Sequence, residues 1–124
     1  MDLQRDAQLS AGSVAGTQLL DIRTGEGLAI AGGRSLSLSA RELGLLVALA
    51  RDEGHVIARE RLYEQVWGSD LRPGDRTVDV YVRKLRVKLE RALPEWRFIH
   101  THVGFGYRFA AERSQGFHTE ATIR

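Results

Sequence analysis

The chain contains no cysteine among its 124 residues. Neither a disulfide-stabilised scaffold nor a metal site with thiolate ligands can therefore form. Long apolar segments are missing as well, because no apolar run approaches the roughly 18 residues that cross a bilayer. Residues 1–16 also lack the apolar stretch and cleavage pattern of a secretory signal. These absences predict a cytoplasmic protein that has no membrane partner.

Groupings of catalytic side chains are also lacking. The sequence offers no nucleophile beside a base, no paired carboxylates next to an apolar pocket and no set of metal ligands. His100 and His102 lie two residues apart and so share a face of a strand, but no third metal ligand lies within sequence reach. Local hydrogen bonds or phosphate contacts are the roles expected for these histidines. We therefore expect no enzyme activity, no cofactor, no metal and no small-molecule substrate.

The charge of the chain is small in total and unevenly distributed. The formal net charge is +2. Residues 1–39 carry three basic and four acidic side chains, whereas residues 72–109 carry nine basic and four acidic ones. Neutralisation of phosphates supplies most of the sequence-independent affinity for nucleic acid. A basic second half therefore indicates a surface that faces nucleic acid.

The length of the chain bounds the number of domains. With 43% hydrophobic residues, 124 residues suffice for one modest core and hardly for two. Residues 1–16 are polar, small and punctuated by glycine, which is typical of a linker or tail that buries nothing. We therefore expect a disordered linker or tail over 1–16, one domain over 17–111 and a flexible C-terminal tail over 112–124.

The first half of the expected domain contains strand and helix patterns. Three short alternating segments between residues 18 and 39 are separated by glycine-containing turns, which predicts a small antiparallel sheet. Ser39 and Glu42 then form the S-x-x-E pattern of a capping box. The apolar periodicity that follows predicts a helix that ends near residue 52.

Three further elements follow. A second helix is expected over residues 59–67, with Gly68 ending it. A third helix is expected over about residues 75–92 and ends before Pro94, because proline cannot continue a helix. Residues 97–109 alternate around a glycine-containing turn, which predicts a terminal hairpin.

The third predicted helix has two dissimilar faces. One apolar stripe can pack on a core, and it consists of Val78, Val82, Leu85, Leu89 and Ala92. The opposite face consists of Arg76, Val80, Arg83, Lys84, Val87 and Arg91. A solvated face would mix charges and avoid outward valines. A helix in a DNA major groove needs donors for guanine and phosphate together with apolar groups for thymine methyls.

The order of these elements is that of a winged helix-turn-helix in the α+β class, with an N-terminal antiparallel sheet, three helices and a C-terminal β-hairpin wing. In this fold the first two helices pack against the apolar stripe of the third, which is then free to enter a groove. We therefore expect sequence-specific binding of double-stranded DNA for transcriptional regulation. The third helix would lie in the major groove, and the wing would lie on the backbone or in the minor groove.

Four motifs resemble one known family. They are SAREL at residues 39–43, VWG at 66–68, DRTVDVYVRKLR at 75–86 and GFGYRF at 104–109. In this order and spacing they closely resemble the effector domain of OmpR/PhoB-type bacterial response regulators. Residues 99–109 are most similar to the actinobacterial GlnR-type nitrogen regulators within that family.

The resemblance implies a transcription factor of a two-component phosphorelay that binds tandem half-sites head to tail, as a tandem dimer on promoter DNA. It also implies control by a phosphorylatable receiver domain. Nothing in the sequence resembles the acidic pocket and partner lysine of a receiver, and the length leaves no room for one. Either the chain is an effector half, with residues 1–16 as remnant linker, or the protein regulates without a receiver.

Carried over position by position, the resemblance implies a set of DNA contacts. These are Arg59, Trp67, Arg76 and Thr77 to phosphates, Arg83 and Lys84 to base edges or adjoining phosphates, Tyr81 beside the groove, and Thr101 and Tyr107 to the backbone from the wing. Val80 and Val87, taken from the helix pattern, are the expected apolar contacts to bases. His102 is included as a contact from the wing.

Three positions depart from the family's pattern. Ala58 stands where a serine or threonine helix cap is usual, a loss of about 1 kcal/mol. Lys84 stands where arginine is common, so bidentate recognition of guanine becomes a single-point donor. Val103 replaces the wing arginine that enters the minor groove in relatives, and His102 or His100 would substitute for it only weakly.

A second hypothesis is that the winged helix mainly binds protein. In this alternative, residues 69–74 contact RNA polymerase. This hypothesis would be favoured if the loop were needed to retain the protein at a promoter and the basic helix were not.

Overall fold

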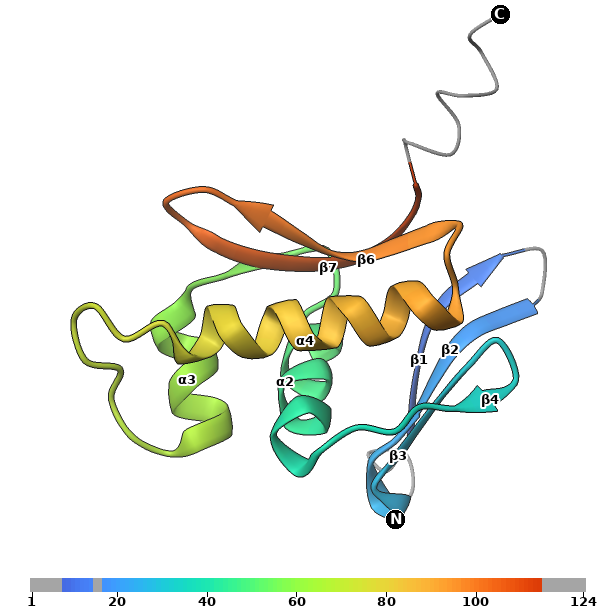
Figure 1. Ribbon diagram of the computed structural model, residues 1–124, viewed down its shortest axis with the longest axis horizontal. Coiled ribbons are helices and arrows are strands. Elements are labelled where there is room, and N and C mark those ends of the chain that lie inside the picture. The colour runs from blue at the N-terminus through green and yellow to red at the C-terminus, as the bar shows by residue number, and fades with distance from the viewer. Residues whose placement is uncertain (1–7, 15–16, 115–124) are drawn as a thin grey trace, which may run out of the picture.

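The computed structural model describes residues 8–14 and 17–114. In chain order the elements are β1 (Gln8–Val14), β2 (Thr17–Arg23), the 3-10 turn η1 (Thr24–Glu26), β3 (Leu28–Ala31), β4 (Arg34–Ser35), α2 (Ala40–Arg51), β5 (Val56–Ile57), α3 (Arg59–Trp67), α4 (Thr77–Ala92), β6 (Trp96–His102) and β7 (Gly106–Arg113). In Figure 1, α4 crosses the middle of the molecule, with the β6–β7 hairpin along one side of it. This α+β arrangement is the predicted winged helix-turn-helix.

The N-terminal sheet is an antiparallel meander in the order β1-β2-β3-β4. Leu20 and Ile22 of β2 pair with Ala31 and Ala29 of β3, respectively. Because side chains alternate between the faces of a strand, these four lie on one face, and each is 1% exposed or less. The sheet therefore contributes one apolar face to the core. Its last strand is limited to two residues, Arg34–Ser35.

The ends of the two helices after the sheet are set by their capping residues. The predicted capping box of α2 is present, because Ser39 Oγ accepts from the backbone N–H of Glu42 at 3.1 Å and Glu42 Oε1 accepts from that of Ser39 at 2.8 Å. Helix α3 begins and ends at the predicted residues. Gly68 ends it with a φ of +81°, a left-handed conformation that glycine adopts without strain.

The apolar stripe of α4 lies in the core, as its periodicity predicts. Val78, Val82, Leu85 and Leu89 are each 2% exposed or less, and Ala92 is half-buried. The stripe packs with buried leucines of α2 and α3 and with the wing. The first two helices and the wing thus hold one side of α4, which leaves its other side outward.

The wing belongs to a three-stranded sheet in the order β5-β7-β6. Strand β5 lies between α2 and α3 in sequence and pairs with β7 through Val56↔Arg108 and Ile57↔Tyr107. The hairpin is anchored in the core by Phe98 and Phe109, whose ring centroids are 5.9 Å apart. The orientation of the wing is therefore coupled to the helix pair as well as to α4.

The N-terminal end of the domain differs from the predicted linker. Residues 8–14 form β1, which runs antiparallel to β2 with Gln8 opposite Arg23 and Val14 opposite Thr17. Pairing at a sheet edge uses backbone N–H and C=O groups, which a small polar segment supplies as well as any other. Composition alone therefore could not exclude this strand. The rest of the predicted linker, residues 1–7 and 15–16, lies outside the described residues.

The C-terminal end also extends past the predicted boundary at residue 111. Strand β7 continues to Arg113, and the backbone N–H of Ser114 donates to Glu95 O at 2.9 Å. Residues 115–124 of the predicted tail lie outside the described residues. None of the helices in the described ranges is long and apolar enough to cross a bilayer.

Candidate nucleic-acid interface

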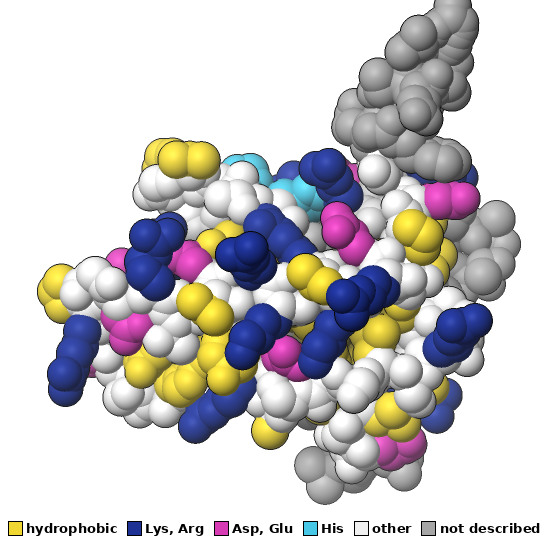
Figure 2. Space-filling view, in the orientation of Figure 1, with side chains coloured by type: hydrophobic (Ala, Val, Ile, Leu, Met, Phe, Trp, Pro, Cys, Tyr) yellow, Lys and Arg dark blue, Asp and Glu magenta, His cyan; other side chains and the backbone are white. Residues whose placement is uncertain are grey.

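The outward face of α4 is open to solvent. Val80 and Val87 are 47% and 40% exposed, and the side chains of Arg83, Lys84 and Arg91 are exposed beside them. These five residues line one shallow groove together with Glu42 and Lys88. Figure 2 shows lysine and arginine side chains spread over this side of the molecule, with apolar side chains between them. The face combines charged donors with apolar patches, as the sequence predicts.

The two cations at the centre of this face differ in their contacts. Arg83 has no hydrogen-bond or ion-pair partner among the described residues. Lys84 Nζ lies 4.9 Å from the centroid of the Tyr81 ring, which is a cation–π distance. Arg83 is therefore available to a ligand, and Tyr81 restricts where the Lys84 ammonium can lie.

Aromatic rings connect α3 to α4 below Lys84. Trp67 stacks on Tyr63 at 5.0 Å between centroids and meets Tyr81 edge-on at 5.2 Å. Arg41 of α2 lies over the Trp67 ring at 5.4 Å and donates to Val66 O at 2.7 Å. Trp67 is half-buried. Its ring therefore packs between helices, while the arginine above it adds a cation that the sequence prediction did not include.

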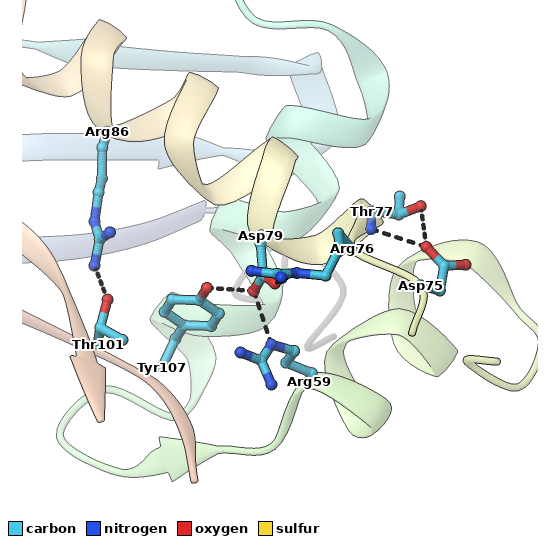
Figure 3. A network of polar contacts seen from close by, with 8 residues as sticks. All are labelled: Arg59, Asp75, Arg76, Thr77, Asp79, Arg86, Thr101 and Tyr107. Atoms are coloured by element: carbon cyan, nitrogen blue, oxygen red, sulfur yellow. Dashed lines mark hydrogen bonds and ion pairs between the residues drawn. The ribbon is translucent and has the colours of Figure 1, made fainter. Parts of the chain in front are cut away.

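Asp79 collects hydrogen bonds from three parts of the fold (Figure 3). Its Oδ1 accepts from Arg59 Nε of α3 at 2.7 Å and from Tyr107 Oη of β7 at 2.5 Å. Its Oδ2 accepts from Arg76 Nε, just before α4, at 2.7 Å. These three donors engage both carboxylate oxygens, and Arg83, one turn further along α4, does not pair with Asp79.

The environment of Asp79 keeps it ionised. Burial of this side chain would raise its pKa, but the hydrogen bonds from Tyr107, Arg59 and Arg76 outweigh burial and lower the pKa to about 2. Burial raises the pKa of Tyr107, and the hydrogen bond to Asp79 raises it further. The phenol therefore stays protonated and donates to the carboxylate.

The N-terminus of α4 is occupied by an acid of the chain itself. Asp75 Oδ1 accepts from the backbone N–H of Thr77 at 2.9 Å and from its hydroxyl at 2.5 Å. This bond starts the helix at Thr77 rather than at the predicted residue 75. Both donors of Thr77 are engaged, so the predicted phosphate contact from Thr77 is not available in this arrangement. Arg76, with 73% of its side chain exposed, remains open.

At the base of the wing, Arg86 joins α4 to β6. Its guanidinium donates to Ile99 O at 3.0 and 3.1 Å and to Thr101 Oγ1 at 2.6 Å, and burial lowers its pKa. Arg86 therefore holds the base of the wing to α4. Thr101 is exposed and accepts this bond, so its hydroxyl proton is still available to a phosphate.

Tyr107 differs from its predicted role. The residue is 5% exposed, and its only hydroxyl proton points to Asp79. A phosphate needs a donor, so this hydroxyl cannot serve one while the bond to Asp79 is made. His102 Nε2 accepts from Arg108 Nε at 3.0 Å, which leaves Nδ1 as its other polar atom.

The tip of the wing is apolar. Val103 is 87% exposed and Phe105 is 76% exposed, with the turn residue Gly104 between them. No cation stands at the tip itself. Val103 thus presents a bare isopropyl group to solvent where the resemblance implied an arginine.

Three cations near the α4 face were left out of the predicted contacts. Arg41 and Arg91 are exposed, and helical periodicity had placed Arg91 on the outward face without including it among the predicted contacts. Lys88 Nζ bonds Glu42 Oε1 and Ser37 O, each at 2.7 Å. These partners lie 46 and 51 residues away, so no local pattern indicates them. No three His, Asp or Glu side chains in the described ranges gather as metal ligands.

Comparison with known proteins agrees with this geometry. Residues 33–109 match the family described as "Transcriptional regulatory protein, C terminal". The chain belongs to this family. Membership confirms the resemblance to OmpR/PhoB-type effector domains and identifies the chain as a domain of transcriptional regulation.

Individual proteins that are similar to this chain agree with this assignment. The DNA-binding response regulator MtrA of Mycolicibacterium smegmatis is 41% identical over 76 residues, which is 61% of this chain and 33% of MtrA. The DNA binding domain of CpxR from E. coli superimposes with a TM-score of 0.71 at 30% identity, covering 83% of this chain and 95% of that one. The Klebsiella pneumoniae RstA DNA-binding domain, solved in complex with RstA box, superimposes with a TM-score of 0.70 at 31% identity. The match covers 83% of this chain and 96% of that one. The chain spans about a third of the length of curated relatives such as MtrA.

Proposed function

We propose that this domain binds double-stranded promoter DNA in a sequence-specific manner and that α4 enters the major groove. One observation carries the proposal: the face of α4 opposite its buried stripe is open and offers Arg83, Lys84 and Arg91 together with Val80 and Val87. Two exposed valines lower solubility, but in a major groove they can pack against thymine methyl groups. The structural similarity to the RstA DNA-binding domain, solved in complex with RstA box, supports DNA binding by this domain.

The proposed DNA contacts are of two kinds, those to base edges and those to the backbone. Arg83 and Lys84 would read base edges, with Val80 and Val87 against methyl groups. Arg59 and Arg76 would meet phosphates, because each uses only its Nε on Asp79 and keeps its terminal amino groups for another acceptor. Trp67 and Tyr81 would flank the groove. Thr101 and His102 would approach the backbone from the wing.

Selection of bound duplexes from a random DNA pool tests the proposal. An enriched consensus, bound more weakly as salt rises, is the expected result. Removal of one cation on the α4 face, Arg83→Ala, should weaken binding to the consensus. Arg51→Ala is the matched control, since Arg51 is exposed in a groove formed by η1, α2 and α3 and should leave binding unchanged. Absence of any enriched sequence would overturn the proposal.

The finer assignments are proposed on the resemblance alone. We infer a response-regulator context with tandem half-sites bound head to tail, in a protein controlled by a receiver domain. Half-sites one helical turn apart in the selected consensus would support it. The resemblance to GlnR-type nitrogen regulators stays a prediction from residues 99–109.

A contact to RNA polymerase through residues 69–74 has one supporting feature. All of these residues except Leu71 are exposed, and the loop projects beyond the ends of α3 and α4 in Figure 1. Replacement of this loop by a glycine–serine segment should reduce transcription while DNA affinity is retained. Unchanged transcription would count against the contact.

A further inference from the structure

Asp79 stands at the junction of α3, α4 and the wing. The three donors that reach its carboxylate come from Arg59, Arg76 and Tyr107, at 2.5 to 2.7 Å, and only 14% of the Asp79 side chain is exposed. Figure 3 shows these side chains converging on Asp79 from separate elements. One carboxylate thus fixes the relative positions of a helix pair and a strand.

The charge of Asp79 opposes the proposed ligand. A carboxylate beside two phosphate-facing arginines repels the DNA backbone and cancels part of their positive charge. On charge alone, its removal should raise affinity for every duplex by the same factor. An acid in this place is therefore useful only if its geometric effect outweighs its electrostatic one.

The geometric effect follows from which donor each arginine uses. Arg59 and Arg76 both bind Asp79 through Nε, so the carboxylate sets the direction in which each guanidinium plane points. The terminal amino groups are left for a phosphate. Tyr107 extends the same constraint to β7, because its hydroxyl bond determines the distance between the wing and the first turn of α4.

We propose that Asp79 is a positioning residue for sequence discrimination. It fixes the orientation of the two arginines and of the wing, so that the base-reading face of α4 fits the groove at a single depth. Its negative charge at the same time lowers the affinity for non-specific DNA. This inference rests on the proposed DNA-binding function. In this role Asp79 acts through Arg59, Arg76 and Tyr107 and needs no contact of its own with a base or a phosphate.

The test compares two duplexes of equal length, the selected consensus and a scrambled version. Asp79→Asn keeps the size of the side chain and removes its charge. We expect affinity for the scrambled duplex to rise or stay level while affinity for the consensus falls, so that the ratio of the two drops about tenfold. Tyr107→Phe changes no charge, and it should lower the ratio with the scrambled duplex unaffected.

Asp75→Asn is the matched control. It removes the same charge from the same end of α4, and asparagine can still accept from Thr77. Its effect should be a parallel gain on both duplexes. A parallel gain for Asp79→Asn as well would overturn the positioning role. If the unaltered chain selects no sequence at all, the proposed function fails first, and the two failures are thereby distinguished.

Folding is checked for each variant by circular dichroism. Should Asp79→Asn fail to fold, Tyr107→Phe decides, since it removes one bond to the carboxylate and leaves both arginine bonds in place. An unchanged ratio for a folded Tyr107→Phe would then contradict the coupling to the wing.

Discussion

Gly106 lies directly against the backbone carbonyl group of Ile57. A Cβ built at Gly106 would overlap that carbonyl oxygen and come within 2.9 Å of Ala58 Cα, and the φ of Gly106 is +145°. The contact is between two backbones, so no side chain can move to relieve it. The first residue of β7 must therefore be glycine for β5 to pair with the wing.

Replacement of Gly106 by alanine should consequently destabilise the whole domain. We expect Gly106→Ala to lower the free energy of unfolding by about 3 kcal/mol or more, measured by urea denaturation. Gly104→Ala is the control, because its φ is +83° but nothing lies within 4 Å of an added Cβ. That variant should lose about 1 kcal/mol from backbone strain alone. Equal losses for the two variants would show that the approach to Ile57 is not the cause.

Substitution of Ala58, in contrast to that of Gly106, is expected to stabilise the domain. It is the N-cap of α3, with an extended φ and ψ of −66° and 148° and no side-chain bond to the helix. Ala58→Ser should add this bond and stabilise the domain by about 1 kcal/mol in thermal or urea unfolding. Ser39→Ala, which removes the cap of α2, should lose a similar amount. A neutral Ala58→Ser would mean that the hydroxyl does not reach the free amides.

The elements that were predicted correctly depend on neighbours in sequence. The capping box of α2 joins residues three apart, and the buried stripe of α4 follows from a spacing of three and four. Such patterns are local, so the sequence contains all the information they need. The open, basic face of α4 follows from the same periodicity.

The details that were missed depend on partners far along the chain. Asp79 binds Arg59 and Tyr107, which lie 20 and 28 residues away. The same distant contact also determines that the Tyr107 hydroxyl donates to Asp79. Strand β1 was missed for a different reason, because edge pairing through backbone groups has no side-chain requirement.

The ion network around Asp79 predicts a pH dependence of stability. Its pKa is lowered to about 2 in the fold, from an ordinary value near 3.8. A lowered pKa means that the fold gains stability above the unfolded value, and that this gain is lost as pH falls from about 4 to about 2. The difference in unfolding free energy between the unaltered chain and Asp79→Asn should thus be about 2 kcal/mol at pH 6 and shrink towards zero near pH 2.

This comparison isolates Asp79 because other acids cancel. Glu42 also has a lowered pKa, since its bonds from Lys88 and Ser39 outweigh burial, but it is present in both proteins. Asp70→Asn, which removes one acid from an exposed loop residue, serves as the control for the change in net charge. A pH-independent difference for Asp79→Asn would contradict the ionised network.

Base reading and phosphate contact can be separated at two cations. Lys84→Ala should change preference among sites by about 1 to 3 kcal/mol, because it removes a donor to base edges. Arg76→Ala should weaken binding to both the consensus and the scrambled duplex and reduce the salt slope by about 1. Lys84→Arg should sharpen preference for guanine, since a guanidinium can bind it in bidentate fashion. Equal losses on both duplexes for Lys84→Ala would exclude base reading at this position.

The apolar wing tip predicts a gain from one added charge. Val103 is 87% exposed at the end of a hairpin whose base is held to α4 by Arg86 and Tyr107. An arginine there could enter a narrow minor groove, where the negative potential is strongest over A·T-rich sequence. Val103→Arg should therefore steepen the salt slope of binding by about 1 and raise affinity most for duplexes with A·T-rich flanks. Gln65→Arg adds the same charge to an exposed position of α3 that lines a groove with α2, and it should produce neither effect. If both variants gain equally and without regard to flanking sequence, the wing tip does not reach DNA, and the wing acts only through its base beside α4.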